Sequence, residues 1–452
     1  MKNFLNTLQN IWKIEDLRTR ILNTLGFILI YRIGSFVVLP GLDPSQLGAL
    51  QAQTSDGILG LLNMFSGGAF SNASIFALGI MPYISASIVL QLAGMAVPAL
   101  QKLQKEGESG RKKINQYTRY LTILITAGQA PGYIANLKSQ LPLEAFLVPE
   151  MLFWATAWLI LITGTVFVMW LGERITDKGI GNGISLLIMV GIIASLPFSF
   201  LAEVTARFSP GAVGGPVFLL LELVILLLVI VLSILLVQGT RRIPVQVARA
   251  AISGRQALPQ GGSRQYIPLK VNAAGVMPII FAQAIMFVPI TVAGFAETPD
   301  SMLGQIGAAF SDFTGLAYNL TFFFMIIIFT YFYTAITINP NQMAEDMKRG
   351  GSFIPGVKPG RKTAEYIDNI MSRITLPGSI FLGIIAILPS FAMIAGINAQ
   401  FAQFYGGTSL LIMVGVVLDT LQQIESHLLM RHYDGLMKSG RIKGRSSMSM
   451  SA

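Results

Sequence analysis

The chain has 452 residues, of which 53% are hydrophobic and only 12% are charged, and its formal net charge is +10. Together with a mean hydropathy of +0.63, this excludes an ordinary soluble globular domain and indicates a membrane protein with several spans. The chain contains no cysteine, which excludes disulfides, thiol chemistry and thiolate metal sites. Both histidines lie at the end of the last predicted span, so a histidine metal site or proton relay is not expected.

The beginning of the chain is charged rather than apolar. Residues 1–20 have no clean apolar core, so we expect no cleavable signal peptide there. The stretch LNTLQNIWKIEDLRTRIL predicts an amphipathic helix on the membrane surface instead. Hydropathy then predicts an all-α polytopic membrane protein with ten transmembrane helices. The predicted spans are 21–39, 73–96, 120–134, 153–171, 184–200, 217–237, 271–295, 321–338, 376–397 and 409–428.

The second span is unusual because a short apolar segment, residues 58–65, precedes it and is too short to cross a bilayer. The pair Gly67–Gly68 interrupts the chain there, and the pair Ser71–Asn72 is placed to cap the longer helix that follows. Lipid offers no partner to a free backbone N–H or C=O, so such a break survives only inside protein or beside a water-filled cavity. The segment therefore indicates a pathway through the molecule.

Lys and Arg are concentrated in the loops on one side of the predicted spans. The alternate loops hold only Lys138 and Arg207. By the positive-inside rule, both termini and every basic loop are cytoplasmic. Five spans precede the outer loop around Pro210–Pro216 and five follow it, so the two halves must be inverted relative to one another. No clear sequence repeat accompanies this topology.

The predicted organisation has four parts. They are an amphipathic cytoplasmic segment (1–20), an N-terminal half (21–208) with the short segment at about 57–68, a C-terminal half (209–437) with cytoplasmic loops at about 240–270 and 339–375, and a disordered tail (438–452).

Three charged residues fall within or near spans, and such residues are candidates for function by default. Arg32, Glu222 and Asp419 lie on three different helices with no obvious pairing. We expect each to be neutralised inside the helix bundle or to lie near an interface. An ion-coupled carrier would more often show acidic clusters facing a site at the membrane midplane.

Several motifs are similar to those of one known family. MFSGGA (64–69), ALGIMPYISAS (77–87) and MWLGERITDKGIGNGIS (169–185) resemble the SecY family, the central subunits of the bacterial protein-conducting channel. The resemblance runs from YRIGSF (31–36) to the last span. It implies two pseudo-symmetric halves arranged as a clamshell with a re-entrant plug helix. The implied function is a passive, gated channel in the cytoplasmic membrane, with no enzymatic activity and no cofactor. The competing hypothesis is an inverted-repeat secondary transporter of a small solute.

The resemblance implies an aliphatic pore ring, which can block ions by excluding water. Its residues are Ile80, Ile84, Ile184, Ile188, Ile280 and Ile412. It also implies an outer plug that contains Leu59, Leu62, Asn63, Phe65, Gly67 and Gly68. If the resemblance is set aside, isoleucine at helical spacing in a membrane helix would simply face lipid or the core. The short segment at 58–65 would then be an ordinary outer-loop helix.

A lateral gate that opens toward lipid is a further implication. Gln91 and Asn272 match the family's gate cluster, and Gln129 aligns loosely as a third member. Polar side chains that face one another across such a seam hold it with modest hydrogen bonds. The alternative is that these side chains form permanent hydrogen bonds between helices that do not move.

Two cytoplasmic loops carry the remaining signal. RRIPVQVARA (241–250) and SRQYIPLKV (263–271) predict a hairpin around Gly261–Gly262, and residues 339–377 contain a Pro/Gly-rich tip that leads into a short helix. The basic residues singled out are Arg241, Arg242, Arg255, Lys348, Arg349, Lys358 and Arg361. Topology alone could explain this charge. The resemblance instead implies docking of the ribosome and of a SecA-like ATPase, although Lys358 stands where the family commonly has Arg.

The remaining implied partners are SecE-like and SecG-like membrane subunits, signal sequences, nascent polypeptides and membrane lipid. The glycine-rich GIGNG (179–183) lacks the phosphate-loop pattern and predicts a tight turn. No nucleotide motif or nucleophile–base pair is evident in the sequence, so the energy for transport is expected to come from a partner.

Overall fold

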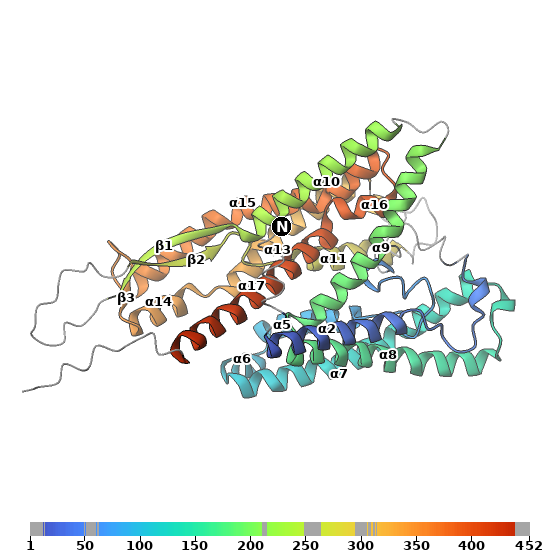
Figure 1. Ribbon diagram of the computed structural model, residues 1–452, viewed down its shortest axis with the longest axis horizontal. Coiled ribbons are helices and arrows are strands. Elements are labelled where there is room, and N and C mark those ends of the chain that lie inside the picture. The colour runs from blue at the N-terminus through green and yellow to red at the C-terminus, as the bar shows by residue number, and fades with distance from the viewer. Residues whose placement is uncertain are drawn as a thin grey trace, which may run out of the picture. The chain divides into compact units, whose positions relative to one another are not determined.

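The computed structural model describes residues 14–48, 63–209, 215–247, 264–293 and 314–438, together with the isolated positions 12, 50, 60, 305, 309, 310 and 312. The chain forms two compact units, unit 1 (Met1–Ser195 with Val416–Ala452) and unit 2 (Leu196–Gly415). Both are built mainly from helices (Figure 1). The chain passes from one unit to the other inside two helices, α9 (Gly183–Phe208) and α17 (Gly407–Lys438).

Unit 1 is a bundle of helices around α7. Its complete helices are α2 (Glu15–Gly34), α5 (Met81–Ala96), α6 (Pro98–Lys105), α7 (Glu108–Gln140) and α8 (Glu150–Lys178). Helix α7 packs against α5, α6 and α8, and α2 packs against α8. Pro98 cannot continue α5, and the chain bends by 102° between Met81–Gly94 and Pro98–Gln104.

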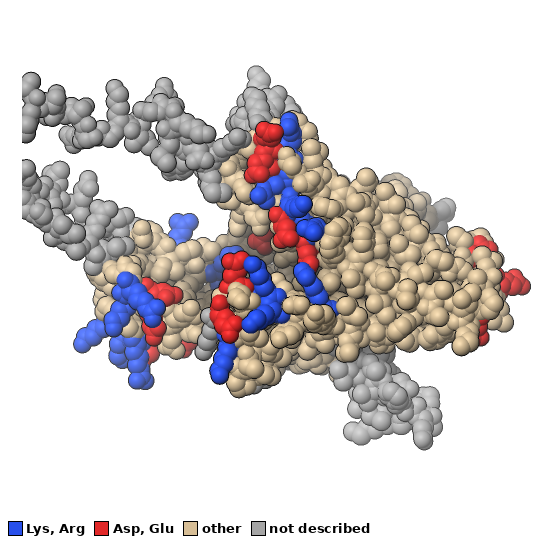
Figure 2. Space-filling view, turned by 90° about the horizontal axis from the view of Figure 1, so that it is seen from below, with Lys and Arg blue, Asp and Glu red and all other residues tan. Residues whose placement is uncertain are grey.

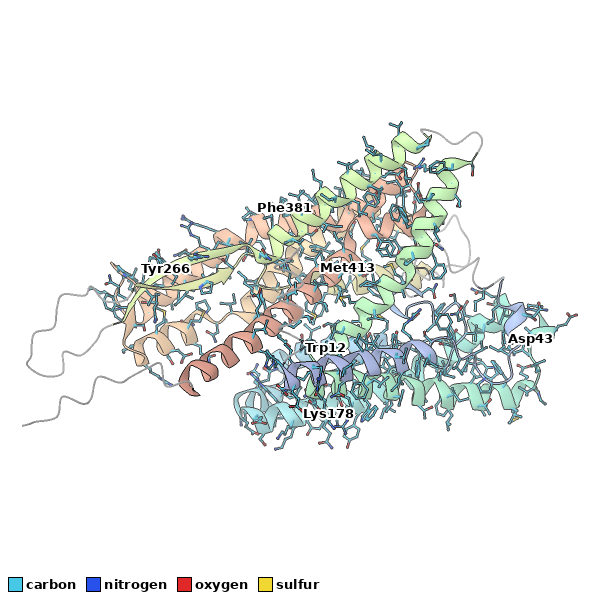
Figure 3. The ribbon with its side chains drawn as sticks, in the orientation of Figure 1. Trp12, Asp43, Lys178, Tyr266, Phe381 and Met413 are labelled. Carbon is cyan, nitrogen blue, oxygen red and sulfur yellow. The ribbon has the colours of Figure 1, made fainter. Side chains whose placement is uncertain are left out.

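One end of unit 1 is closed by connecting segments rather than by helices. The 3₁₀ turns η1 (Pro44–Gln46) and η2 (Leu143–Ala145) lie close together, because the Asp43 N–H donates to the Ala145 carbonyl at 2.9 Å. Beneath them is a buried core that includes Leu42, Tyr133, Leu137 and Phe153. Figure 3 shows Asp43 at this end and Lys178 at the opposite end of the unit.

Unit 2 contains the helices α10 (Gly215–Gln238), α11 (Met277–Ala293), α13 (Leu316–Thr337), α14 (Pro340–Arg349), α15 (Arg361–Ile394) and α16 (Ala399–Ala402), and the 3₁₀ turn η3 (Gln403–Tyr405). Helix α13 packs against both α11 and α15, and α15 also contacts α10. Along α10 the residues Glu222, Val229, Ser233 and Leu236 are buried, whereas large apolar side chains cover the opposite face. That exposed apolar face suits contact with lipid.

A three-stranded antiparallel sheet extends from the helices of unit 2. Strand β1 (Thr240–Val247) pairs along its length with β2 (Arg264–Lys270), and its last residues pair with β3 (Ser352–Phe353). The two strands of the predicted hairpin are therefore confirmed, and Gly261–Gly262 lies outside the described residues. The pairing with β3 was not predicted, because that strand is only two residues long and lies in a different loop.

Helices lie at all of the predicted span positions, but several boundaries differ. Helix α15 is one continuous helix of 34 residues through Pro377 and Pro389, so the predicted short helix after the loop tip and the predicted span 376–397 are a single element. Burial of one face from Thr363 to Ala392 outweighs the local effect of the prolines. The part of the predicted surface helix that is described, from Glu15, simply continues into α2.

Within the described residues, six helices are long and apolar enough to cross a membrane, or up to seven if the bent pair α5–α6 counts as one span. The six are Glu150–Lys178, Gly183–Phe208, Gly215–Gln238, Leu316–Arg349 (α13 taken together with α14), Arg361–Ile394 and Gly407–Leu428.

Candidate functional site

The segment before α5 is a buried run of turns, residues 66–80, inside unit 1. The prediction of a helix from Ala73 is wrong, because α5 begins at Met81 with Ile80 as its N-cap residue. Gly67 and Gly79 have φ of +66° and +54°, which a right-handed helix excludes. The chain therefore enters the helix later than its apolar pattern suggested.

The predicted cap at Ser71 and Asn72 is also wrong. The Ser71 N–H donates to Asn63 Oδ1 at 3.0 Å, and the Asn72 N–H donates to the Gly68 carbonyl at 3.1 Å. These local bonds fold the segment back on itself and leave no free end for a helix to start from.

Side chains and backbone groups from distant elements form hydrogen bonds with the backbone carbonyl and N–H groups of this segment that have no local partner. The bonds run from Tyr31 OH to Ser66 O (3.1 Å), from Arg32 Nη1 to Gly67 O (2.8 Å), from Tyr133 OH to Phe70 O (2.9 Å) and from the Ile75 N–H to Val37 O (2.9 Å). A non-helical segment buried among membrane helices requires such partners, since lipid supplies none.

Glycines allow this segment to lie directly on helix backbones. A Cβ on Gly67 would lie 2.9 Å from the Gly191 Cα of α9, and a Cβ on Gly191 would lie 2.9 Å from the Phe65 carbonyl oxygen. A Cβ on Gly164 of α8 would collide with the Ile75 carbonyl. We call the close approach of Gly67 to Gly191 the glycine contact. It replaces side-chain packing with direct contact between two backbones.

The described plug candidates lie at residues 63–68, where a short helical stretch (63–65) ends in a turn (66–68), and we call this segment the 63–68 turn. Phe65 and Gly67 are buried, whereas Asn63 and Gly68 are partly buried. Asn63 shapes the turn from both its backbone and its side chain, because its carbonyl accepts from the Gly68 N–H at 2.9 Å. Leu59 and Leu62 lie outside the described residues.

Four of the pore-ring candidates belong to unit 1. Ile80 and Ile188 are 3% and 6% exposed, and Ile84 is half-buried one turn after Ile80 on α5. Ile188 lies one turn before Gly191, so it shares a face of α9 with the glycine contact. Ile184 is half-buried beside Gly172 of α8, where a Cβ would approach its Cγ1 to 2.9 Å.

The other two pore-ring candidates belong to unit 2. Ile280 is half-buried near the start of α11, and Ile412 is buried near the start of α17.

The gate candidates differ in their surroundings. Gln91 is half-buried on α5, and its Nε2 lies 3.5 Å from Ser87 Oγ. Gln129 is exposed on α7. Asn272, in the turns before α11, is buried, and its Oδ1 has no hydrogen-bond partner among the described residues. An amide oxygen of this kind is an acceptor available to a neighbouring helix.

The structure joins the two basic loops into one module, which we call the basic module (β1, β2, β3, α14 and the start of α15). Its core contains Ile243, Leu269, Met347 and Ile354, from both loops. Arg241, Arg242, Lys348, Arg349, Lys358 and Arg361 are all exposed around this core, and Arg255 lies outside the described residues. Figure 2 shows a cluster of Lys and Arg at the end where Figure 1 labels β3 and α14.

One face of the basic module is hollowed. Thr240, Arg242, Gln265, Tyr266 and Pro268 line an open depression of about 510 Å³ on the β1–β2 ribbon. Figure 3 labels Tyr266 on this ribbon. An arginine beside an exposed aromatic ring is a combination that suits contact with another macromolecule.

A buried ion cluster in unit 2 was missed from the sequence. Arg207, assigned there to an outer loop, lies in the last turn of α9 and is buried. Its Nε donates to Glu203 Oε1 at 2.7 Å and its Nη2 donates to Glu222 Oε1 at 2.6 Å. Glu222 therefore has a partner that the sequence did not reveal. The i, i+4 spacing of Glu203 and Arg207 was the available signal.

The same cluster binds the connection between α15 and α16. Arg207 Nη2 donates to the Gly396 carbonyl at 2.8 Å, and the Asn398 N–H donates to Glu203 Oε2 at 2.8 Å. The guanidinium lies 4.6 Å from the centroid of the Phe218 ring. Burial and the two neighbouring carboxylates raise the pKa of the Tyr405 hydroxyl.

The GIGNG stretch forms the tight turn between α8 and α9, as predicted. Gly181 has a φ of +81°, and its N–H donates to Gln423 Oε1 of α17 at 2.8 Å. The Ile180 N–H donates to Thr24 Oγ1 at 3.1 Å. The turn therefore ties α2, α9 and α17 together within unit 1. Among the described residues there is no cluster of three or more acidic or histidine side chains that could hold a metal ion.

Curated relatives match nearly the whole chain. A protein translocase subunit SecY of Streptomyces scabiei is 43% identical and covers 94% of this chain and 98% of its own length. The corresponding subunit of Chlamydia trachomatis is 40% identical and covers 97% of this chain and 99% of its own.

Solved structures share the fold at lower identity. A structure described as that of a protein-conducting channel has a TM-score of 0.60 and 17% identity, and covers 90% of this chain and 92% of its own. Sec61 in a canine ribosome–channel complex has a TM-score of 0.56 and 17% identity, with the same coverage. The SecY family itself matches residues 74–421. The chain is thus a multi-pass protein of the cytoplasmic membrane, and it belongs to the SecY family.

Proposed function

We propose that this chain is the pore-forming subunit of a protein translocase. It passes unfolded secretory polypeptides across the cytoplasmic membrane and releases apolar segments into lipid. Its relatives carry the name protein translocase subunit SecY, which favours a channel over a transporter of small solutes. The chain acts as a passive conduit, and partners supply the energy.

The observation that carries the proposal is the buried segment 66–80 in unit 1. Non-helical backbone at membrane depth needs protein or water around it, and here α2, α8 and α9 supply contacts. We assign residues 57–68 as a plug that closes the channel at rest. A structural relative with 18% identity and a TM-score of 0.59 is described as having a plug domain that stabilises its closed state, which supports this assignment.

The pore ring is proposed to combine residues from both units. Ile84, Ile188, Ile280 and Ile412 are the strongest candidates, with Ile80 and Ile184 beside them. A narrow ring of aliphatic side chains excludes water and ions while it remains deformable enough for diverse polypeptide side chains. The position of Ile188 one turn from the glycine contact supports this, because this one candidate lies close to the described part of the proposed plug.

A lateral gate is proposed that involves Gln91 on α5 and Asn272 in the turns that lead into α11, with Gln129 as a weaker member. The Asn272 Oδ1, which has no partner among the described residues, is the best support. A gate of this kind opens at low cost, because interhelical hydrogen bonds between polar side chains are worth only about 0.5–2 kcal/mol each.

The proposed topology has ten spans, α2, α5, α7, α8, α9, α10, α11, α13, α15 and α17, with both termini and the basic module in the cytoplasm. The exposed cations of the module would bind the phosphates of ribosomal RNA or acidic surfaces of a SecA-like ATPase. A relative described as bound to a yeast ribosome, with a TM-score of 0.58, supports the first of these. SecE-like and SecG-like subunits complete the proposed complex.

The test uses the absence of cysteine in the chain. A single Cys is placed at Ile84, and a Cys-bearing secretory precursor is stalled partway across the membrane. We expect a disulfide between the two that requires both the signal sequence and an energy source. Val89 on the same helix is 47% exposed and provides the matched control position.

A crosslink at Val89 without one at Ile84 would mean that the pore is wrongly placed. A precursor that never enters the channel would contradict the proposed function itself.

A further inference from the structure

We propose that Arg32 of α2 is a positioning residue that holds the plug closed and releases it on opening. The inference rests on the plug assignment above and adds to it the group that fixes the plug's base. Arg32 Nη1 donates to the Gly67 carbonyl at 2.8 Å. Gly67 is the residue at which the 63–68 turn meets α9.

Gly67 is held between Arg32 and the backbone of α9. On one side the guanidinium of Arg32 lies so close that a Cβ on Gly67 would be 2.9 Å from Nη1. On the other side the same Cβ would be 2.9 Å from the Gly191 Cα. The neighbouring carbonyl, Ser66 O, accepts from Tyr31 OH at 3.1 Å, so two successive residues of α2 bind two successive residues of the turn. This pairing fixes both the position and the orientation of the base of the plug.

The nature of the acceptor makes the contact reversible. Among the described residues, Arg32 forms no ion pair with a carboxylate, and its charge is bound by a backbone carbonyl and by the face of Phe36, whose centroid lies 5.1 Å away. A carbonyl is a neutral acceptor, so its bond to a guanidinium is weaker than a bidentate ion pair. When the turn leaves, the released guanidinium can be solvated by the water that fills an open channel.

A backbone acceptor also makes the contact independent of the plug's side chains. The plug sequence can change while Gly67 O remains in place, so only the conformation of the turn is required. Arg32 would therefore act on the backbone of the turn and not on its side chains. Its guanidinium carries several donors in a rigid fork, which a lysine ammonium does not reproduce.

The experiment measures halide efflux from proteoliposomes that contain the purified channel complex at rest. Arg32→Gln removes the charged donor, and we expect about a tenfold faster leak, because a charge-assisted hydrogen bond to a buried carbonyl is lost. Arg32→Lys should fall between wild type and Arg32→Gln. Tyr31→Phe, which deletes one hydroxyl without a change of shape, should raise the leak by a smaller factor.

The matched control is Arg20→Gln. Arg20 lies on the same helix and its Nη1 also approaches a backbone carbonyl, that of Gly179 at 3.4 Å, but it does not contact the plug. Its leak should equal that of wild type. The deletion of residues 58–65 is measured alone and together with Arg32→Gln.

The outcomes separate this inference from the plug assignment. If the deletion leaks and Arg32→Gln adds nothing to it, Arg32 acts through the plug as proposed. If Arg32→Gln and Tyr31→Phe stay as tight as wild type while the deletion leaks, the role of Arg32 is overturned and the plug stands. If Arg32→Gln increases the halide leak equally with and without residues 58–65, the proposed role of Arg32 is also overturned. A deletion that does not leak contradicts the plug assignment itself.

Discussion

Two arginines, the buried Arg207 of unit 2 and the half-buried Arg32 of unit 1, are held in different ways. Arg207 of unit 2 binds two carboxylates, Glu203 and Glu222, and a backbone carbonyl. Arg32 of unit 1 binds a backbone carbonyl in the 63–68 turn and, among the described residues, no carboxylate. A guanidinium bound by two buried carboxylates cannot leave without exposing uncompensated charge, whereas one bound by a carbonyl can. The first suits a permanent brace and the second a contact that opens.

Asn272 is paired less than either arginine, because its amide oxygen has no partner among the described residues. The polar groups of the helical region thus range from fully paired (Arg207), through singly bound (Arg32), to open (Asn272). The loss of stability when each side chain is replaced should fall in that order, because it depends on which partner groups are left unpaired.

Arg207→Leu should have the largest effect. It leaves two buried carboxylates without their cation and is expected to cost about 3–5 kcal/mol of stability. The measurement is the apparent melting temperature of the protein purified in detergent. The control is Arg241→Leu at an exposed position, which should melt like wild type.

Neutralising one carboxylate tests the cause. Adding Glu222→Gln to Arg207→Leu should recover part of the lost stability. A double variant that melts lower than the single one would show that Arg207 does not act by balancing these charges.

Gly191→Ala should have the next largest effect. The new methyl group would lie 2.9 Å from the Phe65 carbonyl oxygen and 3.1 Å from the Gly67 nitrogen, so the 63–68 turn must move away from α9. We expect a cost of about 1–3 kcal/mol and a faster halide leak at rest. Gly128→Ala is the matched control, because a Cβ there meets nothing within 4 Å. Equal leaks from the two variants would show that the glycine contact does not hold the turn.

Asn272→Leu should change selectivity more than stability. The substitution removes an amide oxygen that makes no bond among the described residues, so the melting temperature should be nearly unchanged. Export of precursors with weakened signal sequences should shift by about tenfold or less, which is the upper range for one polar side chain between membrane helices. Signal selectivity identical to wild type would remove Asn272 from the gate.

Arg361→Glu should have the smallest effect on folding. Its side chain is 91% exposed, so stability should stay within about 0.5 kcal/mol of wild type. Binding to ribosomes, measured by co-sedimentation over a range of salt, should weaken most at low ionic strength. Lys138→Glu, in unit 1 and outside the basic module, is the control, and an equal loss there would mean that Arg361 acts only through net charge.

Patterns within short windows of sequence predicted much of this molecule. Apolar runs located the helices, and β-branched residues located β1 and β2. GIGNG indicated a tight turn because glycine there needs no distant partner to bend. The comparisons support the family and the channel that the motifs indicated. The roles of the individual pore, gate and docking residues stay predictions.

The failures occurred where a segment depends on residues far away in the chain. The start of α5 was misplaced because residues 66–80 are held by Tyr31, Arg32, Val37 and Tyr133, none of which is near in sequence. Likewise, Arg207 meets Gly396 across 189 positions, and β3 meets β1 from another loop.

Hydropathy and charge by themselves therefore determined that this chain is a helical membrane protein, and roughly where its helices lie, because lipid requires each span to satisfy its own backbone. Tertiary structure alone decided which polar groups are paired. A buried carbonyl or carboxylate finds its partner in space, and that choice gives Arg207 of unit 2 two carboxylates and Arg32 of unit 1 a backbone carbonyl.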